Sequence, residues 1–255
     1  MKKQVTLILL ITFCITGCGT NLFDSFIDDP EESITEQIEN ASTPAEYALL
    51  IEETQKIIDS DASDEEKGNA YLIQAEAILG KSEITPLDII GKIATSIDTN
   101  DNPLNLLNSL ASKEDLLDAS NALYQANELG IPGDEDQQLM KGIVNTLVVV
   151  TTITNTFEID SDGNIKNEDS INYRESLETI MHPNSDDPNK DIFHYSEEAY
   201  KGFSESNSLT KEQEEKSNKI KSEAEKIEET YNDRNNLSDQ EIEEKLTDIF
   251  KTFGN

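Results

Sequence analysis

Residues 134–169 read DEDQQLMKGIVNTLVVVTTITNTFEIDSDGNIKNED and contain the longest apolar run of the chain, from Leu139 to Phe157. The apolar residues of this run fall on nearly all sides of a helix, a pattern typical of the buried centre of a helical protein. The acidic residues after Gly133 favour a helix start, because negative charge is stabilised at a helix N-terminus. The alternative is a buried strand pair, since residues 148–153 are all β-branched. We predict a central helix.

This run is not typical of a transmembrane segment. It contains Lys141, Asn145, Asn155 and five threonines, and each of these side chains would need a polar partner inside lipid. We therefore expect the run to lie in the core of the protein body.

The N-terminus carries the pattern of an export signal. Lys2 and Lys3 precede an apolar segment, residues 5–15, which is too short for a stable membrane anchor. The segment ends in Ile15-Thr-Gly-Cys18, which resembles the lipobox of bacterial lipoproteins. The resemblance implies a signal peptide of residues 1–17, cleavage before Cys18 and a diacylglycerol on the Cys18 sulfur, with palmitate among the acyl chains. The alternative is an ordinary secretory signal with a chance cysteine.

The same resemblance implies attachment to the bacterial cell envelope through the lipid anchor. An aspartate directly after the lipidated cysteine resembles an inner-membrane retention signal. This chain has Gly19 at that position instead, so we favour the outer membrane over the inner. The other cysteine, Cys14, lies in the removed segment. The mature chain would then have no free thiol, which excludes disulfides, cysteine metal sites and a cysteine nucleophile.

The chain is strongly acidic. Its formal net charge is −33, and loss of Lys2 and Lys3 with the signal peptide changes it to −35. Such a chain is repelled by nucleic acid and by anionic lipid headgroups. We therefore expect no nucleic-acid partner, and membrane attachment through lipid rather than through charge.

Helix start signals recur along the body. Capping boxes begin at Thr43 and Ser63, and further starts fall at Thr85, Asn102 and Ser112. Short loops between the expected helices imply antiparallel neighbours. We predict an all-α fold of antiparallel helical hairpins around the central helix.

Part of the chain is similar to tetratricopeptide-type helical hairpins. The similar residues are Tyr71-x3-Ala75-x2-Ile78, with Ala94 nineteen residues after Ala75, and less clearly residues 119–126. The resemblance implies a repeat array with a concave surface for a partner protein or ligand. The alternative is an irregular bundle, because tryptophan is absent and the 34-residue period is not held.

The remaining organisation follows from composition. We expect a lipidated tether and short helix over residues 18–42, the hairpin body over 43–207, and a charged C-terminal helical hairpin over 208–255. Within the body we expect a helix from Ser170 to Met181 and another starting at Ser196.

An acidic loop, residues 158–169, follows the central run and resembles the twelve-residue calcium loop of EF-hand proteins. The resemblance implies one calcium ion, held by four carboxylates and one backbone carbonyl around Gly163. The carbonyl would be that of Asn164, and the carboxylates those of Glu158, Asp160, Asp162 and Asp169. The alternative is a tight Asp-Gly turn joining residues 157–159 to 164–166 as a small hairpin.

Enzymatic function finds no support in the sequence. His182 and His194 lack metal-ligand spacing, and the chain contains no phosphate-binding, dinucleotide or serine-hydrolase motif. We expect a non-enzymatic interaction or scaffold lipoprotein, with a probable protein partner bound between about Thr43 and Gly130. The alternative is a solute- or ligand-binding lipoprotein of an envelope transport system, stabilised by calcium.

Overall fold

The computed structural model describes residues 33–82, 112–159, 164–166, 171–184, 187, 190–206 and 211–253. The described residues are almost all helical. Their helices are α2 (Ile34–Asn40), α3 (Pro44–Ile58), α4 (Asp64–Lys81), α7 (Lys113–Glu128), α8 (Glu135–Thr156), α9 (Tyr173–Met181), α10 (Ile192–Glu205), α11 (Lys211–Asp233) and α12 (Asp239–Phe253). The predicted all-α fold is confirmed. The helices expected after Thr85 and Asn102 lie outside the described residues.

Side-chain caps fix most helix starts. Thr43 and Ser63 form reciprocal capping boxes with Glu46 and Glu66, as predicted. Asp134 caps α8 in the same way, through Gln137. These contacts satisfy the backbone N–H groups that have no partner within the helix.

The central run is one continuous helix, α8, so the strand-pair alternative is wrong. Threonines within it bond back to their own helix: Thr146 Oγ1 donates to the Gly142 carbonyl at 2.8 Å, and Thr156 Oγ1 to the Thr152 carbonyl at 2.7 Å. These bonds satisfy the hydroxyls without a neighbouring strand.

The start of α10 differs from the prediction. The helix begins at Ile192 rather than at Ser196, because Asp191 is its N-cap and accepts a hydrogen bond from the His194 N–H at 2.8 Å. Ser196 instead lies inside the helix and donates to the Ile192 carbonyl.

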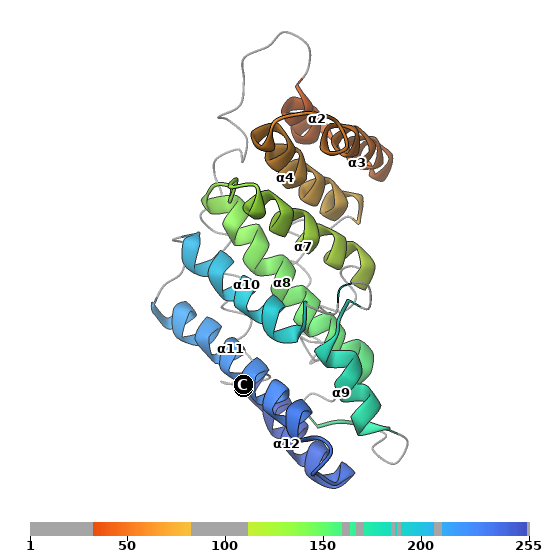
Figure 1. The fold of residues 1–255 in the computed structure, drawn as a ribbon, viewed down its shortest axis with the longest axis vertical. Coiled ribbons are helices and arrows are strands. Elements are labelled where there is room, and N and C mark those ends of the chain that lie inside the picture. Colours follow the sequence, from red (N-terminus) through yellow and green to blue (C-terminus); the bar gives the residue numbers. More distant parts are fainter. Residues whose placement is uncertain are drawn as a thin grey trace, which may run out of the picture.

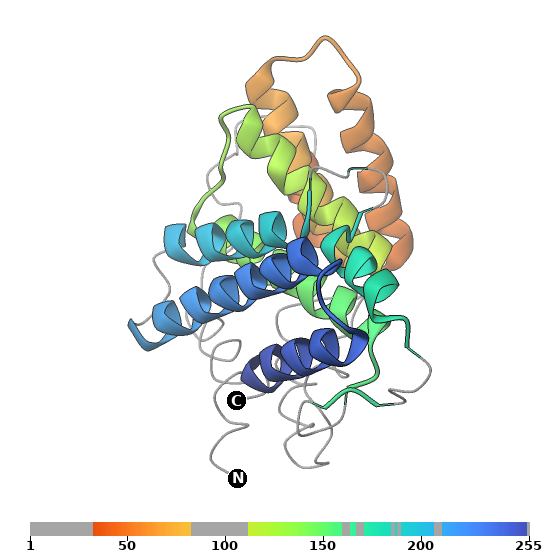
Figure 2. The ribbon, with the colours of Figure 1, turned by 60° about the horizontal axis from the view of Figure 1, so that its bottom comes forward.

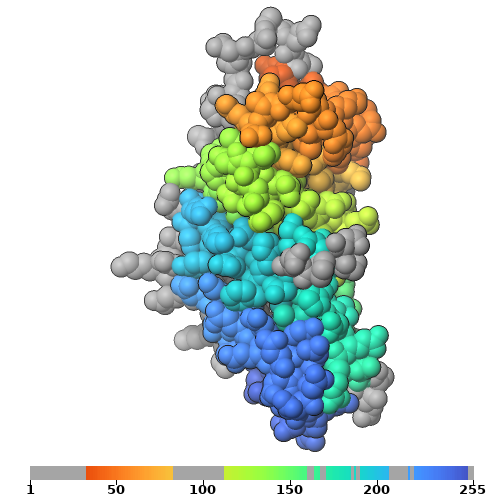
Figure 3. All heavy atoms as spheres, viewed as in Figure 1, coloured from red at the N-terminus to blue at the C-terminus, as the bar shows by residue number. Residues whose placement is uncertain are grey.

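The helices stack in an elongated series (Figures 1 and 3). The α2–α4 unit forms one end, α7, α8 and α10 lie in the middle, and α11 and α12 form the other end beside α9. Figure 2 shows α10 and α11 running alongside one another. Each helix therefore packs mainly on its neighbours in the series.

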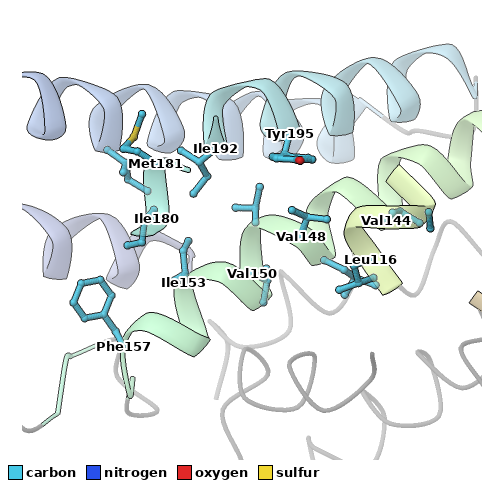
Figure 4. Close-up of a cluster of buried hydrophobic side chains, with 14 of the residues drawn as sticks. Leu116, Val144, Val148, Val150, Ile153, Phe157, Ile180, Met181, Ile192 and Tyr195 are labelled. Carbon is cyan, nitrogen blue, oxygen red and sulfur yellow. The ribbon is translucent and has the colours of Figure 1, made fainter. Parts of the chain in front are cut away.

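The main core follows α8 (Figure 4). On α8 itself Val148 is fully buried, and so is its C-cap residue Phe157. Around them lie side chains from α7, α9, α10 and α12, of which the fully buried ones include Leu116, Leu177, Ile180, Ile192 and Phe250. Phe157 packs on Phe250 with ring centroids 5.5 Å apart. The apolar side of the C-terminal hairpin thus belongs to the same core as the central helix.

Polar contacts add to this packing at the turn between α11 and α12. The Arg174 side chain of α9 donates to the carbonyls of Arg234 and Leu237 and pairs with Asp239. Tyr231 Oη of α11 donates to Glu178 Oε1 at 3.0 Å. The turn is therefore tied to α9 on the body.

Within the described residues, no helix combines the length and the apolar character that a membrane crossing requires.

Candidate functional site

The predicted calcium loop has ends that pair with each other. Ile159 and Ile165 form an antiparallel bridge, and the Lys166 N–H donates to the Glu158 carbonyl at 2.8 Å. Both isoleucines are buried, which anchors this bridge in the core. Asp160, Asp162 and Asp169 lie outside the described residues, so only Glu158 and Asn164 of the predicted ligands are placed.

Glu158 already has a cationic neighbour. Lys166 Nζ lies 3.1 Å from Glu158 Oε1, and both side chains are about half exposed. A calcium ion bound through Glu158 would have to displace this ammonium group. Among the residues that the structure describes, no group of three acidic, histidine or cysteine side chains is placed to hold a metal ion.

Calcium binding by the loop stays a prediction. With calcium, we expect the melting temperature to exceed the values with magnesium or with chelator, because the ion relieves repulsion between the loop carboxylates. The variant Asp160→Ala/Asp162→Ala should lose this response. Equal melting temperatures of the wild type under all three conditions would mean that the loop is only a turn.

The two histidines lie at separate aromatic contacts. The His182 ring contacts Tyr231 with centroids 5.9 Å apart, while His194 lies between Tyr124 and Tyr195 at 5.5 and 5.4 Å. Burial is the main reason that the pKa of His194 is lowered. These environments are those of packed rings at helix junctions.

A buried ion pair joins α8 to α10. Lys141 Nζ lies 2.5 Å from Glu198 Oε2, and both side chains are less than a tenth exposed. Lys201 Nζ lies 2.9 Å from the other carboxylate oxygen. Burial alone would raise the pKa of Glu198, but the two lysines outweigh it and hold the pKa below its usual value.

The neighbouring polar groups at this junction also have partners. Lys190 Nζ donates to Asn121 Oδ1 at 2.7 Å and lies 4.5 Å from the centre of the Tyr124 ring. Ser120 Oγ donates to Asn145 Oδ1 at 2.7 Å. These hydrogen bonds join α7 to α8 and to the segment that precedes α10.

An open hollow lies at the other end of the array, in the α2–α4 unit. It has a volume of about 450 Å³. Five of its nine lining residues are apolar and four are polar or charged: Ile34, Thr35, Ile57, Ser60, Ala62, Glu66, Asn69, Ala70 and Ile73. We call it the α2–α4 hollow. Its volume is in the range of natural binding pockets, but it opens directly to solvent.

Local contacts shape the hollow. A small separate core holds α2 against α3 and α4, with Ile38, Leu50 and Ala77 almost fully buried. At the α3–α4 turn, Ser60 Oγ donates to the Ile57 carbonyl at 2.7 Å and accepts from the Ala62 N–H at 3.1 Å. The position of α2 against α3 and α4, and the shape of the α3–α4 turn, therefore follow from packing and from turn hydrogen bonds.

The turn beside the hollow is strongly acidic. Asp59, Asp61, Asp64, Glu65 and Glu66 are all exposed. Glu66 accepts hydrogen bonds from the Ser63 N–H and Oγ, each at 2.8 Å, and the backbone bond is the first cause of its lowered pKa. The Glu66 carboxylate, which is part of the lining, therefore stays ionised at neutral pH.

A second electrostatic feature of α4 is Glu76, which is half-buried. Burial, and then the negative charges of Glu39 and Asp134, raise its pKa from 4.5 to about 8. Because the folded state holds a proton that the unfolded state releases, this group makes the protein less stable as pH rises from about 4.5 to 8.

Glu76→Gln should remove that penalty. We expect the melting temperature of the variant, relative to the wild type, to increase as pH is raised from about 5 to 8. The matched control, Glu225→Gln on the exposed side of α11, removes one negative charge elsewhere on the surface. Parallel curves for Glu76→Gln and the wild type would contradict the prediction.

Comparison with protein-family models, with curated proteins and with solved structures finds no match to this chain.

Proposed function

We propose that this protein is a lipid-anchored lipoprotein of the bacterial cell envelope, with the outer membrane favoured, that acts without catalysis as an interaction scaffold. Cys18 carries the lipid, and the helical hairpins between about Thr43 and Gly130 hold a partner protein. The Ile15-Thr-Gly-Cys18 sequence supports the anchor.

The observation that carries the scaffold proposal is the α2–α4 hollow. It is open, five of its nine lining residues are apolar, and it lies in an end unit of the array. A solute carrier encloses most of its ligand surface, whereas an open hollow suits the side chains of another protein. A few side chains that enter well-packed pockets supply most of the affinity of many protein interfaces.

Filling the hollow tests the scaffold proposal. Ala62 lines the hollow at the α3–α4 turn and is half-exposed, so Ala62→Phe should fill the space while the helices stay folded. Chemical crosslinking in intact envelopes, followed by mass spectrometry, should recover one defined partner with the wild type and lose it with the variant.

The control replaces Glu225, an exposed residue of α11 in the opposite end unit. Glu225→Gln should crosslink the same partner as the wild type. If Ala62→Phe also retains the partner, the hollow is not the binding surface and the proposal fails.

The anchor has its own prediction. Cys18→Ala should accumulate as an unlipidated precursor, because the thiol is the nucleophile that accepts the diacylglycerol. Metabolic labelling with palmitate should mark the wild type alone, and label in the variant would rule out Cys18 as the attachment site.

A further inference from the structure

The α2–α4 hollow combines an apolar floor with an acidic rim. Ala70 and Ile73 are less than a tenth exposed at its floor. The turn that supplies Ser60 and Ala62 to its lining also carries the five exposed acids of residues 59–66. An occupant would therefore meet apolar side chains in the hollow and the negative charges of the adjacent turn.

The negative field extends over the whole α2–α4 unit. Residues 33–82 contain eleven acidic and three basic residues. Fields of this kind raise the encounter rate of positively charged partners and disfavour partners of like charge.

We propose that the α2–α4 hollow takes a cationic amphipathic segment of a partner protein. One or more apolar side chains of that segment enter between α2, α3 and α4, and its flanking lysine or arginine residues lie against the acidic turn. This inference rests on the proposed scaffold function and specifies the chemistry of its partner.

Other occupants fit the observations less well. Anionic lipid headgroups and nucleic acids are repelled by the same charge. Among the described residues, no group of acidic, histidine or cysteine side chains is placed to hold a metal ion. A small solute would leave much of its surface in water, because the hollow is open.

The charge contribution should be measurable. Asp61, Asp64 and Glu65 are exposed, and none of them has a role in the capping box, which uses Ser63 and Glu66. Neutralising these three acids removes three exposed ion pairs with the cationic segment. Binding of that segment should then weaken about tenfold and depend less on salt.

The test uses the full lipidated protein in nanodiscs of phosphatidylcholine, with empty nanodiscs as background. The probe is a short fluorescein-labelled helical peptide of leucine and lysine, and fluorescence anisotropy reports its binding. Two further probes replace lysine by glutamate or leucine by glutamine.

We expect the leucine–lysine peptide to bind the wild type and both altered peptides to bind at least tenfold more weakly. Asp61→Asn/Asp64→Asn/Glu65→Gln should weaken binding about tenfold, and Ala62→Phe should abolish it. If Ala62→Phe lowers the melting temperature, it is replaced by Asn69→Phe, which fills the hollow from α4. This variant should also abolish binding. The control, Glu225→Gln/Glu229→Gln/Glu244→Gln, removes three exposed acids from α11 and α12 and should leave binding unchanged.

The inference is overturned if the glutamate peptide binds equally well, or if the α11–α12 control loses as much affinity as the turn variant. If the leucine–lysine peptide fails to bind while Ala62→Phe still loses its crosslinked envelope partner, the cationic class is wrong and the scaffold function stands. If neither peptide binding nor crosslinking depends on the hollow, both proposals fail.

Discussion

Glu198→Ala is expected to destabilise the protein by about 3–5 kcal/mol, because it leaves the ammonium group of Lys141 buried without its counter-ion. The free energy of unfolding, measured with urea and followed by circular dichroism, checks the value. A loss of less than about 1 kcal/mol, the worth of an exposed pair, would mean that the ion pair is accessible to water.

A double variant separates the pair from the packing around it. Lys141→Met/Glu198→Leu removes both charges and keeps apolar volume between α8 and α10. Such replacements are often neutral or stabilising, so this variant should recover most of the stability that Glu198→Ala loses. If it is no more stable than Glu198→Ala, the loss comes from packing rather than from an unpaired charge.

Gly202→Ala is the second large expected effect. A Cβ at Gly202 would lie 2.5 Å from the Gly142 backbone nitrogen and 2.6 Å from the Gln138 carbonyl oxygen, so α8 and α10 would have to separate. Overpacking of this kind costs about 1–3 kcal/mol, whereas glycine to alanine within an unobstructed helix gains about 1 kcal/mol. Because the obstructing atoms are backbone atoms that cannot rotate away, we expect the upper end of that cost and a net loss of about 2 kcal/mol in urea unfolding.

Gly80→Ala, within α4, is the matched control. The three atoms nearest its new Cβ all belong to the Tyr47 ring, which is only partly buried, and a side-chain ring can move where a backbone cannot. Its cost should therefore be clearly smaller than that of Gly202→Ala. If Gly202→Ala were neutral or stabilising, the close approach of α8 and α10 would be wrong.

Those helix N-termini that have local capping signals could be predicted from the sequence. Thr43 and Ser63 bond to residues three positions later, so the sequence alone contains both partners of each cap. The start of α10 was misplaced because its cap, Asp191, precedes an aromatic run that the prediction did not assign to the helix. The cap therefore lies five residues before Ser196, the expected start of the helix.

The partners across helices could not be predicted in this way. Lys141 within an apolar helix signals the need for a counter-ion, but the chain has 53 acidic residues and only the packing of α10 on α8 selects Glu198. The α2–α4 hollow was missed for the same reason. Its lining combines Ile34, Ile57 and Ile73, which read in sequence as ordinary core positions of three separate helices.

Site-specific photocrosslinking in living cells tests the central claim most directly. A photoreactive amino acid replaces Asn69 in the lining of the α2–α4 hollow or, as the comparison, Glu225 on α11. The scaffold account predicts one discrete protein adduct from position 69 that is absent from position 225 and is lost when Ala62→Phe fills the hollow. No adduct at position 69, or the same adducts from both positions, would contradict it.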